Sequence, residues 1–117
     1  MTDAYQTLIG LLLPAGILDY FELVQVHKSR QGLSLFLEEK NIVPKEYENQ
    51  SLESKGFLPQ VSIQDFPIRG QKVTLEVKRR RWLVKSSGQT ITRDWELVHK
   101  GTRMTEEFAA FLKGIFR

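Results

Sequence analysis

Alternation of apolar and polar side chains between Lys72 and Lys85 constrains the fold more than any other feature of the sequence. Successive side chains of an extended chain point to opposite sides, so a period of two predicts a β-strand here and argues against a helix. One face of the strand would carry Val73, Leu75, Val77, Arg79, Arg81 and Leu83. The other face would carry Thr74, Glu76, Lys78, Arg80, Trp82 and Val84.

Turn-forming residues on both sides of this run predict further antiparallel strands. Downstream, Ser86-Ser87-Gly88 is typical of a hairpin turn. The returning strand is expected over 89–97, with one face formed by Ile91, Arg93, Trp95 and Leu97. Upstream, the alternating segment 61–63 leads into a corner with proline and glycine over 65–70. The second half therefore predicts a small, ribbon-like antiparallel sheet of two to three strands.

The first forty residues predict a helix and then a β-hairpin. A helix is expected over Asp3–Leu13, because apolar residues recur at the spacing of one core-facing helix face. That stripe consists of Tyr5, Leu8, Ile9 and Leu12. Pro14 and Gly16 end the helix. Two runs, Phe21–Lys28 and Leu33–Glu39, then flank a short loop that ends in glycine, which predicts a hairpin.

A second helix is expected near the end of the chain, over Thr105–Phe116. Thr105 suits the cap, and an apolar stripe would face the core through Phe108, Phe111, Leu112 and Ile115. Helices at both ends and strands between them predict the α+β class. We expect an N-terminal lobe over 1–40, a polar, acidic linker or mobile loop over 41–56, and a basic sheet with its helix over 57–117. With 117 residues, one compact domain is also open.

Residue types that the chain lacks exclude several kinds of site. There is no cysteine, which removes disulfides, thiolate nucleophiles and cysteine-ligated zinc, and His27 and His99 are the only histidines. No glycine-rich phosphate loop and no catalytic Ser/His/acid pattern is present. The apolar run Leu8–Ile17 is too short to span a bilayer. We therefore expect a soluble cytoplasmic protein without cofactor, metal or membrane partner.

Charge is distributed unevenly along the chain. Residues 1–68 carry five Lys or Arg against nine Asp or Glu, whereas residues 69–117 carry twelve against five. A basic second half indicates that this part of the chain meets a polyanion, although small domains also reach such asymmetry by chance.

Four consecutive cations and an aromatic residue, Lys78-Arg79-Arg80-Arg81-Trp82, form the most distinctive stretch. Arginine forks bind phosphate in a bidentate manner and Trp82 could stack on a base, which favours a nucleic-acid contact. Charges on an edge strand also prevent aggregation, and a tryptophan commonly packs in a core or across strands. The residues alone leave both interpretations open.

Five blocks in order resemble the N-terminal region of bacterial insertion-sequence transposases of the ISAon and ISL types. They are Asp65–Gly70, Val73–Leu75, Arg79–Trp82, Gly88 and Gly101–Phe108. In ISL-type relatives this region is a zinc ribbon whose two cysteines correspond to Val84 and Ser87. The resemblance, which covers roughly residues 57–117, therefore implies a degenerate ribbon that needs no metal.

The resemblance implies a non-catalytic module that binds duplex DNA at the ends of a mobile element and assists transposition. The carboxylate triad of such transposases lies downstream of this region, so we expect no catalytic residue and no enzyme activity. The implied DNA-binding residues are Lys78, Arg79, Arg80, Arg81 and Trp82, with an outer set of Lys72, Lys85, Arg93, Lys100 and Arg103. The alternatives are a module that pairs with a separately encoded catalytic chain or with itself as a homodimer, and a relic without activity.

Overall fold

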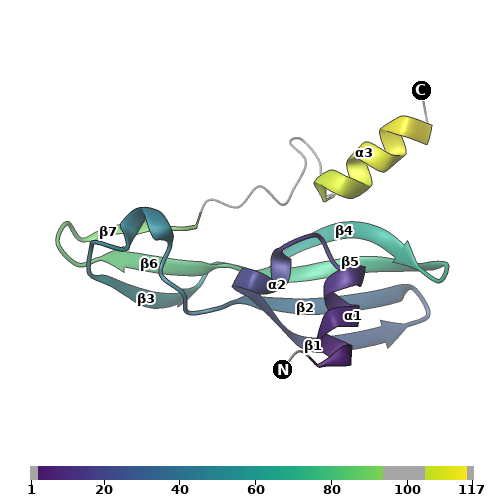
Figure 1. The fold of residues 1–117 in the computed structure, drawn as a ribbon, viewed down its shortest axis with the longest axis horizontal. Coiled ribbons are helices and arrows are strands. Elements are labelled where there is room, and N and C mark those ends of the chain that lie inside the picture. Colours follow the sequence, from purple (N-terminus) through teal and green to yellow (C-terminus); the bar gives the residue numbers. More distant parts are fainter. Residues whose placement is uncertain (1–2, 94–104, 116–117) are drawn as a thin grey trace.

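The computed structural model of the protein describes residues 3–93 and 105–115. Its larger sheet, sheet A, has the strand order β1-β2-β5-β4 (Figure 1). The strands are β1 (Phe21–Ser29), β2 (Gly32–Glu39), β4 (Val61–Ile68) and β5 (Gln71–Lys78). β1 and β2 form the predicted hairpin, and β4 and β5 form a second one. Parallel pairing of β2 with β5 joins the two hairpins.

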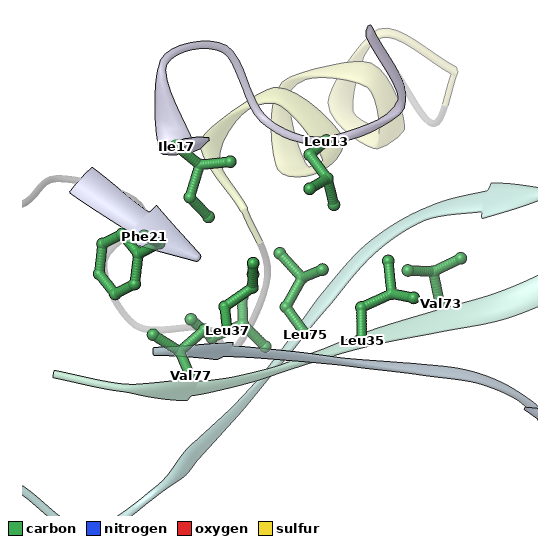
Figure 2. Packing of buried hydrophobic residues seen from close by; sticks show 9 residues of the cluster. Leu13, Ile17, Phe21, Leu35, Leu37, Val73, Leu75 and Val77 are labelled. Atoms are coloured by element: carbon green, nitrogen blue, oxygen red, sulfur yellow. The ribbon is translucent and has the colours of Figure 1, made fainter. Parts of the chain in front are cut away.

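Sheet A buries one face beneath the N-terminal helices. α1 (Ala4–Leu12) and the short α2 (Ile17–Tyr20) lie across this face (Figure 1). Side chains from β2 and β5 point toward Leu13 and Ile17 (Figure 2). The buried cluster consists of Leu13, Ile17, Phe21, Leu35, Leu37, Ile63, Val73, Leu75 and Val77. Each such side chain stabilises the fold by about 1.5–3 kcal/mol. The alternation predicted for β5 therefore builds the centre of the core.

α1 begins as predicted but packs differently. Asp3 caps it, because its carboxylate accepts a hydrogen bond from the Tyr5 backbone N–H at 3.2 Å. In the predicted core stripe, only Ile9 packs against the cluster. Tyr5, Leu8 and Leu12 are 75%, 53% and 47% exposed. The expectation of a buried stripe is wrong, because the helix turns the side with Ile9 toward the core and leaves its other apolar side chains exposed.

The run Lys72–Lys85 is extended, as predicted, but it forms two strands in two sheets. Arg79 separates β5 from β6 (Arg80–Val84), which pairs with β3 (Leu52–Phe57) and β7 (Gln89–Ile91) in the antiparallel sheet B. Burial changes from odd positions in β5 to the even positions Trp82 and Val84 in β6. The two sheets therefore use opposite sides of one nearly continuous strand (Figure 1).

β2 of segment 1–40 pairs with β5 of segment 57–117, so the two segments share one sheet. The intervening 41–56 contains the 3-10 turn η1 (Lys45–Tyr47) and most of β3. Of the strand expected over 89–97, only 89–91 is assigned as β7, and 94–97 lie outside the described residues. None of the described helices is long and apolar enough to cross a membrane.

α3 (Glu106–Ile115) packs on the edge strand β4. Thr105 caps it by accepting from the Phe108 backbone N–H, and its hydroxyl donates to Asp65 Oδ1 at 2.8 Å. Phe66 makes ring contacts with Phe108 and Phe111, with centroids 5.2 and 5.3 Å apart. Phe108 is buried as predicted, whereas Phe111 is 50% exposed, so its expected burial is wrong. The helix is attached by its first turns.

Candidate nucleic-acid interface

The junction between the two sheets is held by a buried carboxylate. Glu39, at the end of β2, accepts a hydrogen bond from the Arg80 backbone N–H at 3.0 Å. Its other oxygen lies 3.3 Å from Arg93 Nε in an ion pair whose side chains are 0% and 8% exposed. The Arg93 guanidinium also donates to the Ile42 carbonyl and lies 4.3 Å from the centroid of the Tyr20 ring. Arg93, expected on the DNA-binding surface, is instead a buried part of the fold.

Arg80 has a similar structural role at this junction. Its guanidinium donates to the Glu39 carbonyl at 3.2 Å and to Ser54 Oγ at 2.7 Å. The same group lies 4.7 Å from the centroid of the Phe57 ring. Arg79, the residue between the sheets, is half-buried and donates to the Arg93 carbonyl. These contacts connect sheet B to sheet A. Two of the four consecutive cations, Arg79 and Arg80, therefore stabilise the junction between the sheets.

Trp82 is buried in sheet B, with 1% of its surface exposed. It lies opposite Ser54 on one side and Ile91 on the other. Its indole N–H has no acceptor among the described residues, so the ring contributes through apolar packing. A ring in this position cannot stack on a base, and the packing interpretation of Trp82 is the one that the structure supports.

Arg81 lies on the opposite side of β6 and is exposed. Lys85, the first residue after β6, is also exposed. Arg81 lines a surface pocket of about 370 Å³ with Tyr47, Thr90 and Thr92. We call Arg81, Lys85 and this pocket the outer face of sheet B. The carboxylate on this side, Glu53, lies 3.5 Å from Lys55 Nζ in an ion pair.

The remaining predicted cations are separated from this outer face. Lys78 is half-buried in sheet A and pairs in register with Glu38 of β2. Lys72 is exposed at the far end of β5. Lys100 and Arg103 lie outside the described residues. Of the ten expected DNA-binding residues, the described structure therefore exposes only Lys72, Arg81 and Lys85 fully.

The residues that correspond to zinc ligands in the resemblance have no ligand chemistry. Val84 is buried in sheet B, and Ser87 lies in the turn before Gly88, whose backbone N–H donates to the Val84 carbonyl at 2.8 Å. Among the described residues, no group of three or more His, Cys, Asp or Glu side chains is placed to hold a metal ion. Hydrogen bonds and apolar packing therefore shape this turn.

Sequence reasoning missed a cluster of cations at the far end of sheet A. The turn between β1 and β2 and the turn between β4 and β5 lie side by side there (Figure 1). They bring together four exposed residues: Lys28, Arg30, Arg69 and Lys72. We call this cluster the basic tip. A lone arginine in a turn gives no signal in the sequence, and the pairing of β2 with β5 that joins the turns spans some forty residues.

Comparison with protein-family models, with curated proteins and with solved structures finds no match to this chain.

Proposed function

We propose that this chain is a non-catalytic DNA-binding and assembly module of an insertion-sequence transposase, acting in the cytoplasm on duplex DNA at the ends of the element. The transposase part of the proposal rests on the five sequence blocks between Asp65 and Phe108. DNA binding rests on the structure of the exposed surface. The chain contributes contacts to DNA, and the cutting and joining chemistry belongs to a separate catalytic part.

The outer face of sheet B carries the proposal. Its pocket is lined by the polar or aromatic residues Arg81, Tyr47, Thr90 and Thr92 and by the apolar residues Leu58 and Ile91. Arginine, threonine and tyrosine side chains supply many of the hydrogen bonds that proteins make to DNA phosphates. Lys85 adds a second exposed cation directly after the strand, at the start of the turn to β7. Because phosphate contacts orient a protein without reading bases, this surface suits a positioning role.

One observation favours the second candidate, a module that pairs with a catalytic chain or with itself. α1 exposes four apolar side chains, Tyr5, Leu8, Leu11 and Leu12, and Leu11 is 78% exposed. Contiguous apolar side chains on a surface are typical of protein–protein contacts. The two functions occupy different surfaces, so the DNA-binding variant described next leaves α1 unchanged.

A fluorescence anisotropy titration of the protein with a labelled duplex at several salt concentrations tests the proposal. We expect the two exposed cations of this face to contribute about −2 to the slope of log affinity against log salt, at roughly −0.9 per phosphate contacted. Replacing Arg79 and Arg80 would disturb the junction, so the informative variant is Arg81→Gln/Lys85→Gln. We expect this variant to make the slope less negative by about 2, and to do so equally for every duplex sequence.

The matched control removes two exposed charges elsewhere, as Lys45→Gln/Lys113→Gln. It should keep the affinity within about twofold if specific contacts and not net charge govern binding. A wild-type protein with no measurable affinity for any duplex would overturn the proposal and leave the protein-pairing function in its place.

A further inference from the structure

The basic tip is formed by two two-residue turns that sheet A holds next to each other. In the first, Ser29 pairs with Gly32 across the loop Arg30-Gln31. In the second, Ile68 pairs with Gln71 across the loop Arg69-Gly70. Each turn therefore has an arginine at its first loop position. Parallel pairing places Leu33 opposite Val73, which brings both turns to the same end of the sheet.

No carboxylate accompanies these cations. The segments 27–34 and 66–74 contain neither Asp nor Glu. Lys28, Arg30, Arg69 and Lys72 are all exposed, and none of them forms an ion pair within the part of the chain that the structure describes. The tip thus carries four positive charges and no carboxylate. Beside the outer face of sheet B, by contrast, the charge of Lys55 is neutralised by Glu53. Among the described residues, the tip therefore has four exposed cations without an ion pair, against two on the outer face of sheet B.

Local contacts define the conformation of both turns. Ser29 Oγ accepts a hydrogen bond from the Gln31 backbone N–H at 3.2 Å. At Gly32 an added Cβ would lie 2.3 Å from the Lys72 carbonyl oxygen, so only glycine allows the two turns to approach this closely. Arg69 has a φ of 53°, and it is the only non-glycine residue of the described chain with positive φ. An arginine kept in this costly conformation points to a role for its side chain.

We propose that the basic tip is a second duplex-DNA site, which binds phosphates through Arg30 and Arg69, with Lys28 on one face of the sheet and Lys72 on the other. The inference rests on the proposed function, because that function names duplex DNA as the polyanion. The guanidinium group of arginine binds two phosphate oxygens at once, and the two turns each expose one such group at the same end of the sheet. Lys72 and Lys85, at opposite ends of β5 and β6, are separated by roughly 40 Å of extended chain. The tip and the outer face of sheet B are therefore distinct contacts.

The test compares three double variants of the full chain on one duplex and on a single-stranded oligonucleotide of the same sequence. Arg30→Gln/Arg69→Asn removes the two guanidinium groups, and asparagine accepts positive φ, so the second turn is preserved. We expect at least tenfold weaker binding at about 0.1 M salt. The slope of log affinity against log salt should become less negative by about 1.8, because two phosphate contacts are lost. Arg81→Gln/Lys85→Gln and the control Lys45→Gln/Lys113→Gln are titrated in parallel.

The results separate this inference from the proposed function. If the tip variant binds like wild type while the variant of the outer face binds weakly, the tip site is refuted and the proposed function stands. Equal small losses in the tip and control variants would mean that net charge alone acts, which also refutes the site. If the tip variant weakens binding only to a single-stranded oligonucleotide, the assignment to duplex DNA is wrong. Absence of duplex binding by the wild type removes both proposals.

Discussion

Glu39 and Arg93, separated by 54 positions in the chain, form a buried ion pair with 3.3 Å between Oε2 and Nε. Glu39 ends a strand of sheet A, and Arg93 follows the last strand of sheet B. The same carboxylate accepts from the backbone of Arg80, so one side chain contacts both sheets. The relative position of the sheets depends on this carboxylate.

Glu39→Ala should therefore be strongly destabilising. It leaves the guanidinium of Arg93 buried without its counterion, which typically costs about 3–5 kcal/mol. The matched control is Glu38→Ala, one residue earlier on the other side of β2, where we expect a change of about 0.5 kcal/mol. Urea denaturation of both variants measures the difference. Similar small losses would show that the Glu39 pair is dispensable.

Stability should depend on pH through Asp65. Burial raises the pKa of this carboxyl above 3.8, Glu107 adds to the rise, and hydrogen bonds from Thr105 and the Phe66 backbone oppose it. The folded state thus holds this proton more tightly than the unfolded state does. The contribution of Asp65 to stability is most favourable below pH 3.8 and declines as pH rises through the folded-state pKa.

Asp65→Asn removes that dependence and retains an acceptor for the Thr105 hydroxyl. We expect the variant to gain stability relative to wild type as the pH is raised from about 3 to 7. Thermal melts of the two proteins across this range provide the comparison. A difference between them that stays constant with pH contradicts the account.

Arg69→Asn alone should raise the free energy of unfolding by about 1 kcal/mol, because asparagine tolerates positive φ better than arginine does. Asn-Gly is also the preferred pair in a turn with positive φ at both central positions. Arg30→Asn is the control, since Arg30 lies in the neighbouring turn without positive φ and should change stability little. A stability gain together with weaker DNA binding would mean that Arg69 is kept for its charge.

The fold should not require metal. Val84 and Ser87 stand where the resemblance places zinc ligands, and a turn stabilised by packing and backbone hydrogen bonds needs no ion. Melting curves with and without a strong chelator should superimpose. A drop in melting temperature with chelator, reversed by added zinc, would contradict this expectation.

Local periodicity predicted most of the element types, although it gave no sign of β3 in the segment expected to be a linker. The α+β class, the β1–β2 hairpin, the extended run through 72–85 and the C-terminal helix are confirmed. Partner choice was not predictable, because the pairing of β2 with β5 depends on packing between segments far apart in sequence. The division at Arg79 was missed for a different reason. The buried apolar residues stand at odd positions up to Val77 and at even positions from Trp82, and the four consecutive cations between them conceal this shift.

The candidate site was less accessible to sequence reasoning than the fold. A run of cations does not show which guanidinium groups will face buried carbonyls, as Arg80 and Arg93 do. The basic tip had no local signal, because its charges are single residues in two turns. The sequence indicated that cations matter in this half of the chain. Which of them are buried in the fold and which are exposed became clear only from the strand topology.

Parallel pairing of β2 with β5 also has a consequence for synthesis on the ribosome. The first hairpin and the N-terminal helices are complete by residue 39, yet Ile63, Val73, Leu75 and Val77 of their core come later. Until β5 has emerged, the nascent chain carries a half-built apolar face and an open strand edge on β2. Such surfaces aggregate readily. Translation speed between codons 40 and 78 therefore sets how long the nascent chain is exposed to misassembly.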